Sequence, residues 1–266
     1  MPATDLPLLI DAALEAGRIA TRYSGQTAAR WDKPQGAGPV TEADLAVNAM
    51  LEQRLPAARP GYGWLSEETE DTTDRLERER VFIIDPIDGT RSFAEGSRTW
   101  AHSLAVAENG VVTAAVIYLP MRDLLYAAAA GQGATLNGKP IAASQTASLE
   151  EAEILAARPN LEGRHWRGGQ APAFTRAYRP SLAYRMALVG QGRFDAMLTL
   201  RPSWEWDIAA GDLILREAQG KCTDRSGKPL RFNNPNPRLN GVIAGGTGIH
   251  ALLCENLDPD GTGIQA

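Results

Sequence analysis

The sequence contains little that would mark a secreted, membrane-embedded or nucleic-acid-binding protein. Only two of its 266 residues are cysteines, Cys222 and Cys254, too few for a disulfide framework and without a metal-binding pattern. No apolar run approaches the roughly 18–20 residues of a membrane-spanning helix, and the first residues lack the basic segment of a secretory signal. The net charge of −5 does not provide the basic surface that nucleic acid requires. We therefore expect a cytoplasmic protein whose partners include neither a nucleic-acid polymer nor a membrane.

The rest of the composition is typical of a globular protein, with 44% hydrophobic and 22% charged residues. The length suits one large domain or two tightly joined halves. A small, polar stretch at 141–151 is the best candidate boundary. It divides the chain into an N-terminal α+β half (1–145) and a C-terminal α/β half (146–266).

Hydrophobic periodicity and turn residues predict secondary structure in both halves. Helices are expected at 4–24, 41–55, 181–191, 206–219 and 249–257. Strands are expected at 62–65, 81–84, 100–107, 111–119, 124–129, 153–157, 195–200, 221–223 and 241–244. Loops or turns are expected at 26–39 (a loop or irregular hairpin), 109–110 (a hairpin turn), 136–140 and 245–248 (a helix-entry turn).

The most informative stretch is VFIIDPIDGT, residues 81–90, in which an apolar strand ends in two carboxylates. Pro86 stiffens the turn between Asp85 and Asp88, and Gly89 allows the backbone to approach a ligand closely. Thr90 adds a hydroxyl next to backbone N–H groups that suit phosphate oxygens. Two carboxylates beside a phosphate need a cation between them, and hard oxygen ligands indicate Mg²⁺ or a similar ion.

A DPxDG sequence by itself is also a common turn, so the metal interpretation depends on further acidic residues. Glu67 and Glu68 form a carboxylate pair at the end of an apolar strand. Residues 41–44 have the pattern of a capping box that places an acid at a helix start. Asp207 lies at the start of a helix rich in small residues, where it could equally be an ordinary N-cap.

Four segments together resemble the inositol monophosphatase superfamily of lithium-sensitive, Mg²⁺-dependent phosphatases. They are VTEAD (40–44), WLSEE (64–68), DPIDGT (85–90) and WDIAAG (206–211), and they occur in the family's order along nearly the whole chain. The resemblance implies a layered αβαβα sandwich like that of fructose-1,6-bisphosphatase. It also implies two or three Mg²⁺ ions and a small-molecule phosphate ester as substrate, with a homodimer as one possible assembly.

The resemblance further implies a role for each matching residue. Glu67 and the Ile87 carbonyl would bind the first metal, Asp85 would bridge two metals, and Asp88 and Asp207 would complete the second. Phosphate would be held by Asp88, Gly89 and Thr90. The catalytic group would be Glu67, Thr90 and Asp44, with Asp44 hydrogen-bonded to Thr90, while Glu68 would support the site and Lys33 would lie near a third, weaker metal position.

In this mechanism a metal lowers the pKa of a bound water, and the water attacks the phosphate in line. Neither a histidine nor a cysteine is required. We accordingly interpret His102, His165 and His250 as structural or surface residues and the two cysteines as packing residues.

The sequence identifies the substrate less clearly than it identifies the metal site. Inositol-specific relatives carry a glutamate seven residues before the aspartate of the WD pair, and this chain has Leu200 there. The segments EWDIAAG and TDRSGKPLRFN (223–233), with Arg91, instead resemble bacterial 3'(2'),5'-bisphosphate nucleotidases, which remove the 3'-phosphate of 3'-phosphoadenosine 5'-phosphate. A second phosphate needs a cation and adenine needs an apolar or aromatic face. The candidates are Arg201, Arg185, Arg158 and Lys139 for the phosphate and Trp204 and Tyr184 for the base, with Arg201 and Trp204 favoured.

Other functions stay open at this point. Inositol-1-phosphate and histidinol-phosphate phosphatases are alternatives within the enzyme class, and a fructose-1,6-bisphosphatase is a weaker one. A regulatory module that binds metal or phosphate without catalysis is a further alternative, as is a scaffold stabilised by Ca²⁺. The complete acidic set argues against both.

Overall fold

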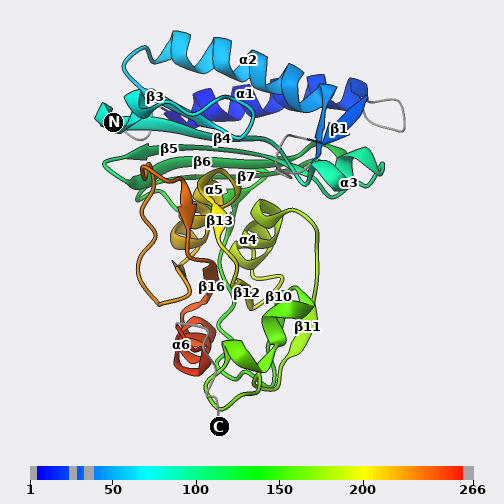
Figure 1. Ribbon diagram of the computed structural model, residues 1–266, viewed down its shortest axis with the longest axis vertical. Coiled ribbons are helices and arrows are strands. Elements are labelled where there is room, and N and C mark those ends of the chain that lie inside the picture. The colour runs from blue at the N-terminus through cyan, green and yellow to red at the C-terminus, as the bar shows by residue number, and fades with distance from the viewer. Residues whose placement is uncertain (1–4, 24–28, 33–38, 260–266) are drawn as a thin grey trace.

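The computed structural model describes residues 5–23, 29–32 and 39–259, which stack in five alternating layers of helices and strands (Figure 1). Helices α1 and α2 cover the outer face of a seven-stranded sheet, and α4 and α5 lie between this sheet and a five-stranded one. Helix α6 packs on the far face of the smaller sheet. The expected αβαβα sandwich is confirmed.

The helices are α1 (Asp5–Ala20), α2 (Glu42–Ala58), α3 (Thr90–Ala94), α4 (Leu182–Gly190), α5 (Glu205–Glu217) and α6 (Thr247–Asn256). The seven-stranded sheet contains, in spatial order, β3 (Gly63–Ser66), β4 (Arg80–Asp88), β5 (Ala101–Glu108), β6 (Val111–Leu119), β7 (Leu124–Ala129), β8 (Ala134–Leu136) and β9 (Lys139–Ile141). Only its β3–β4 pair is parallel.

The five-stranded sheet is mixed. Its spatial order is β11 (Thr175–Ala177), β10 (Glu153–Ala156), β12 (Ala196–Thr199), β16 (Val242–Gly246) and β14 (Gly220–Thr223). Two short ribbons complete the described strands, β1 (Arg30–Asp32) with β2 (Pro39–Thr41) and β13 (Ser203–Trp204) with β15 (Arg238–Leu239).

Local sequence signals explain several of these elements. Thr41 caps α2 in a capping box with Asp44, as predicted. Asn109 and Gly110 both adopt positive φ angles in the tight turn between β5 and β6. The segment at 26–39, expected to be a loop or irregular hairpin, contributes in its described part to the antiparallel β1–β2 pair. The turn at 136–140 joins the short strands β8 and β9, which were not predicted.

The helices of the central layer, α4 and α5, pack against both sheets. One buried cluster joins residues of both sheets to α4 and α5, from Leu65 in β3 to Ala244 in β16. No strand among the described residues pairs across the two sheets, and the division of the chain near residue 145 stays a prediction.

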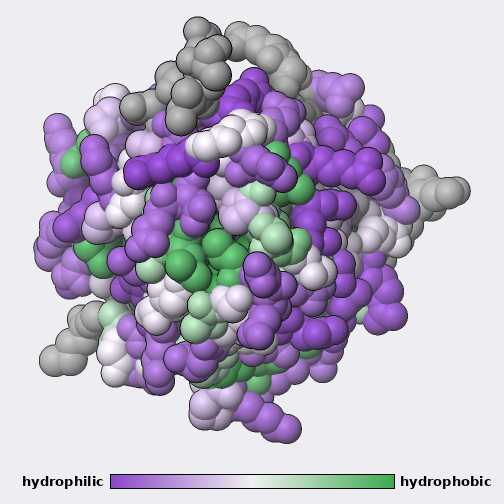
Figure 2. All heavy atoms as spheres, turned by 90° about the horizontal axis from the view of Figure 1, so that it is seen from below, coloured by the Kyte–Doolittle hydropathy of each residue, from purple (hydrophilic) through white to green (hydrophobic). Residues whose placement is uncertain are grey.

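The end of the molecule formed by the smaller sheet and α6 is shown from below in Figure 2. Hydrophilic side chains cover most of this face and surround a small apolar area. In the described part of the chain, no helix is long and apolar enough to cross a membrane.

Candidate metal centre and active site

The C-terminal end of β4 contains a β-bulge that orients two carboxylates. Asp85 is paired with Ser103 of β5 and Asp88 with Ala101, so that Pro86 and Ile87 together oppose the single residue His102. In a regular strand, residues three apart point to opposite faces of the sheet. The one extra residue of the bulge reverses this alternation, so that Asp85 and Asp88 serve one site.

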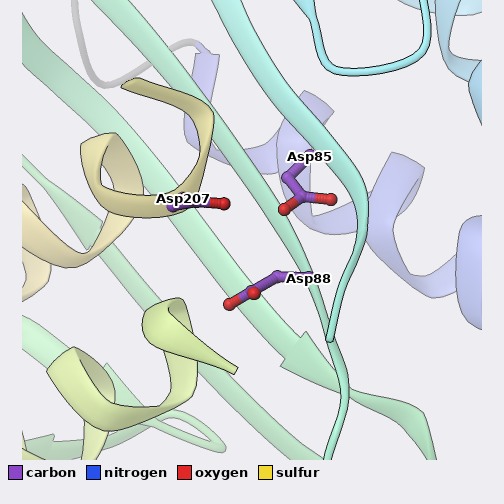
Figure 3. Close-up of side chains that lie close together, drawn as sticks. All are labelled: Asp85, Asp88 and Asp207. Carbon is purple, nitrogen blue, oxygen red and sulfur yellow. The ribbon is translucent and has the colours of Figure 1, made fainter. Parts of the chain in front are cut away.

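Asp207 in the first turn of α5 completes the cluster. One carboxylate oxygen from each of Asp85, Asp88 and Asp207 lies within 4.8 Å of the other two. Figure 3 shows the three side chains converging on one space between β4 and α5. The strand and the helix are about 120 residues apart in sequence and are brought together by packing in the central layer.

The electrostatics of this cluster fit a divalent cation. Burial raises the pKa of Asp85 well above its ordinary value, and the negative charges of Glu67 and Asp88 raise it further. Burial and the charge of Asp88 likewise raise the pKa of Asp207. Asp85 Oδ1 is buried without a hydrogen-bond partner among the described residues. Carboxylates that repel one another, with one buried oxygen lacking a hydrogen-bond donor, are stabilised by Mg²⁺ or a similar hard ion.

Asp88 is held from the C-terminal half of the chain. Its Oδ2 accepts hydrogen bonds from Ser181 Oγ at 2.7 Å and from the Ala183 N–H at 2.6 Å. Ser181 caps α4 and has a positive φ of 65°. Sequence analysis did not single out Ser181, because nothing in the local pattern shows that α4 begins beside Asp88.

A second hydrogen-bonded group adjoins the three aspartates. Thr90 Oγ1 lies 3.1 Å from Asp44 Oδ1 and 3.0 Å from the Ile87 carbonyl. Asp44 Oδ2 accepts from the Thr41 N–H at 2.8 Å, and burial raises the pKa of Asp44 to about 6. The predicted pairing of Asp44 with Thr90 is present in the structure.

Glu67 is the first residue after β3. Its N–H donates to the Ile84 carbonyl at 3.2 Å, which places it beside the end of β4, and its negative charge raises the pKa values of Asp85, Asp44 and Asp207. Glu67 is therefore near the three aspartates, although the group within 4.8 Å in the described chain consists of those three. The Glu68 N–H lies 3.4 Å from Ser66 Oγ, and Lys33 falls outside the described residues.

The cluster of three aspartates, the candidate metal centre, opens into a cavity of about 630 Å³. Asp88 and Asp207 line its inner end with Gly89, whose φ is +96°. A Cβ on Gly89 would make only ordinary contacts, 3.4 Å from Ser181 Cβ and 3.5 Å from the Thr99 carbonyl oxygen, so it is the left-handed backbone conformation that favours glycine here.

Arginines line the outer end of this cavity, and a second cavity of about 560 Å³ adjoins it there. The two cavities share five lining residues: Arg91, Tyr178, Arg185, Thr199 and Arg201. The second cavity also contains Arg164, His165 and Leu200. The cleft thus runs from the aspartates to a basic outer end, and one further acidic residue, Glu95, also lines the first cavity.

Two of the residues predicted to bind substrate lie elsewhere. Trp204 stacks on Trp206, with ring centroids 4.7 Å apart, and Arg238 covers Trp204 at 4.8 Å. Tyr184 is buried in α4, where its hydroxyl accepts from Arg122 Nη1 at 3.3 Å. Neither ring lines the two cavities, so the structure favours Tyr178 as the aromatic face of the cleft. Arg158 and Lys139 do not line these cavities either, whereas Arg201 and Arg185 do.

This combination of layers and acidic residues has a counterpart among known proteins. A model of the inositol monophosphatase family matches residues 3–259. The chain belongs to this family. Its predicted resemblance is thereby confirmed, and the protein is a phosphatase, that is, a hydrolase of small phosphate esters, from a metal-dependent family.

Individual relatives with different names are about equally similar to this chain. It is 34% identical to an inositol-1-monophosphatase of Rhizobium meliloti, over 85% of this chain and 88% of that protein. A histidinol-phosphatase of Mycobacterium tuberculosis is also 34% identical (85% and 90% covered), and a 3'-phosphoadenosine 5'-phosphate phosphatase of Mycobacterium leprae is 31% identical (89% and 87% covered). The solved structure of an IMPase from Thermotoga maritima matches with a TM-score of 0.81 and 30% identity, over 95% of this chain and 96% of that one.

Proposed function

We propose that this phosphatase is Mg²⁺-dependent and acts on a substrate with a second phosphate, and that 3'-phosphoadenosine 5'-phosphate is the best candidate. The observation that carries the proposal is the group of three arginines opposite the metal cluster. Arg91, Arg185 and Arg201 line both cavities at the point where they meet. A phosphate bound at the carboxylate end therefore directs the rest of the substrate toward concentrated positive charge.

Most guanidinium donors of these arginines are available to an anion, although Arg185 Nε donates to the Arg179 carbonyl. Arg185 is buried with its guanidinium 4.5 Å from the centre of the Tyr178 ring, and burial lowers its pKa, with the neighbouring Arg201 adding to the effect. Within the described part of the chain, no hydrogen bond or ion pair engages the guanidinium of Arg91 or Arg201.

The charge of Arg201 lowers the pKa of Asp207 and the charge of Asp88 raises the pKa of Arg185, but within the described residues neither pair forms a salt bridge. Guanidinium donors therefore remain for a phosphate, which they bind with paired hydrogen bonds.

The same arginines separate the alternatives named by the relatives. Histidinol phosphate carries an ammonium group that the arginines would repel, and the inositol ring offers only neutral hydroxyls. Adenosine 3',5'-bisphosphate supplies both a second phosphate and a base for the half-exposed Tyr178 ring. Fructose-1,6-bisphosphate also supplies a second phosphate but has no base.

The proposed chemistry uses the residues of the inner end. Asp85, Asp88 and Asp207, with Glu67 and the Ile87 carbonyl, would hold the metal ions. Bound Mg²⁺ supplies Lewis-acid activation of a water and neutralises charge on the phosphate.

The neighbouring residues position the reactants. The Thr90 hydroxyl, held by Asp44, and the Glu67 carboxylate orient the attacking water, while Gly89 and Thr90 hold the phosphate through backbone N–H groups. Water attacks phosphorus in line and the bond from phosphorus to the ester oxygen breaks. The attacking water gives up one proton and the leaving oxygen takes one up, so that one water is consumed and the products are the alcohol and inorganic phosphate.

The test is phosphate release from four esters side by side: 3'-phosphoadenosine 5'-phosphate, inositol-1-phosphate, histidinol phosphate and fructose-1,6-bisphosphate. Each is assayed with Mg²⁺, with EDTA, and with Mg²⁺ plus Li⁺. We expect Mg²⁺-dependent, lithium-inhibited release with the highest kcat/KM for the nucleotide. A higher kcat/KM for inositol or histidinol phosphate would refute the proposed substrate, and equal turnover in EDTA would refute the metal dependence.

Two further expectations accompany this proposal. The cytoplasmic location and the homodimer stay predictions, which fractionation of the native organism and light scattering of the purified protein can test.

A further inference from the structure

A buried histidine lies directly behind the metal centre. His102 is fully buried on β5, opposite the two bulged residues of β4. Its ring packs edge-on against Trp100 at 5.5 Å and lies 6.3 Å from Tyr118. The next residue, Ser103, points the other way and donates to the Trp206 carbonyl of α5. His102 therefore lies on the sheet face under α1 and α2, away from the cleft.

The ring of His102 is bonded to the backbone of the bulge itself. Its Nδ1 lies 2.5 Å from the Pro86 carbonyl oxygen. A carbonyl oxygen can only accept, so Nδ1 carries the hydrogen in either charge state of the ring. Pro86 and Ile87 both lie opposite one residue of β5, so the regular backbone hydrogen bonds between β4 and β5 cannot satisfy both residues. The His102 side chain supplies a donor at this interruption.

The other ring nitrogen shows that packing alone does not explain this residue. His102 Nε2 is buried without a hydrogen-bond partner in the described part of the chain. An unpaired buried nitrogen costs stability, and a leucine or phenylalanine at this position would avoid that cost. What the histidine adds over such residues is the hydrogen bond to Pro86.

We propose that His102 is a positioning residue for the metal centre, which holds the bulge so that Asp85, the Ile87 carbonyl and Asp88 face one site. It touches neither substrate nor metal and acts through the Pro86 carbonyl. The proposal uses the metal ligands assigned above and is independent of which ester is hydrolysed.

Three variants separate positioning from packing. His102→Leu removes the donor, His102→Asn keeps a donor near the place of Nδ1, and Tyr118→Leu disturbs the same aromatic cluster without touching Pro86. We expect His102→Leu to weaken Mg²⁺ binding by about 10- to 100-fold, as loss of a residue that orients metal ligands does. His102→Asn should recover most of the affinity, and Tyr118→Leu should bind Mg²⁺ like the wild type.

Calorimetric titration of the metal-free proteins measures these affinities without using turnover. Wild-type affinity in His102→Leu would overturn the proposal. Equal losses in folded His102→Leu and His102→Asn, or an equal loss in Tyr118→Leu, would show that packing is responsible and would also overturn it.

A measurement on the unaltered protein covers the case in which the variants do not fold. The chain has only three histidines, so ¹⁵N NMR of histidine-labelled protein can be assigned with single substitutions of His165 and His250. We expect the His102 ring to carry its hydrogen on Nδ1. A neutral ring protonated on Nε2 would exclude the bond to Pro86 and overturn the proposal, whatever the protein hydrolyses.

Discussion

The two ends of the cleft are built in different ways. At the inner end, Asp85 and Asp88 follow one another on a single strand, are buried, and owe their direction to a backbone bulge. At the outer end, Arg91 and Arg201 are exposed, and with Arg185 they come from α3, α4 and the segment after β12. The inner groups are positioned by the backbone, whereas the outer ones are long side chains on separate elements.

Because the two ends are built differently, we expect them to control different kinetic constants. A shift of the backbone at the inner end moves several of the proposed metal ligands together, so substitutions there should lower kcat. A substitution at the outer end changes one side chain and leaves the metal ligands in place, so it should alter KM for particular substrates. Relatives with three different substrate names are 31–34% identical to this chain, so overall similarity does not identify the substrate.

Asp88→Asn should have the largest effect of the changes considered. The substitution keeps the size of the side chain but removes one negative charge that would hold the metal. A bound metal ion supplies several kcal/mol of transition-state stabilisation. We expect kcat to fall by about 1000-fold, on the scale of 1.36 kcal/mol for each factor of ten. Initial rates at saturating Mg²⁺, with a thermal melt to show that the variant folds, provide the measurement. Wild-type kcat would remove Asp88 from the metal ligands.

Arg201→Ala should act on substrate recognition instead. Loss of a charge-assisted hydrogen bond worth about 1.5–3 kcal/mol should raise KM for the bisphosphate by about 10- to 100-fold. KM for a simple monophosphate ester and kcat should change little. Arg193→Ala is the matched control, because it removes the same charge from an exposed arginine that lines neither cavity. Equal increases in KM for both substrates would contradict a role in binding the second phosphate.

Ser181→Ala tests whether the side-chain hydrogen bond from the C-terminal half is needed to hold Asp88, or whether the backbone bond suffices. It removes the hydroxyl that donates to Asp88 Oδ2 but leaves the Ala183 N–H bond. We expect Mg²⁺ affinity to fall by about tenfold, the lower end for residues that orient metal ligands. Removal of the α4 cap should also cost about 1 kcal/mol of stability. Mg²⁺ titration and chemical denaturation measure the two effects, and unchanged affinity would show that the Ala183 bond alone holds Asp88.

The inner end was predictable from sequence because its signals are local. Thr41 and Asp44 are three residues apart, and DPIDGT contains the bulge, two of the three clustered aspartates and the residues that we propose bind phosphate. The contact of Ser181 with Asp88 spans 93 positions and depends on how α4 packs beneath the larger sheet. No pattern in either segment specifies that packing.

For a related reason, the sequence did not show that Tyr184 lies outside the lining of the cavities. Every residue of α4 is buried between the two sheets, so the helix has no polar stripe to show which side faces the cleft. The short strands β11, β13 and β15 were missed because two or three residues carry too little alternation to predict a strand. Tyr178, next to β11, escaped notice with them.

The smallest effect should distinguish Tyr178 from Trp204 as the aromatic residue of the outer end. Tyr178→Ala removes a ring that lines both cavities, and a base stacked on such a half-exposed ring is worth about 1 kcal/mol, so KM for the nucleotide should rise about fivefold. Tyr178→Phe keeps the ring and should keep KM. Trp204→Ala should leave KM unchanged, because that ring is already stacked between Trp206 and Arg238 outside the cavity lining. A larger increase in Trp204→Ala than in Tyr178→Ala would reverse the assignment and require the ring to leave Trp206 when the nucleotide binds.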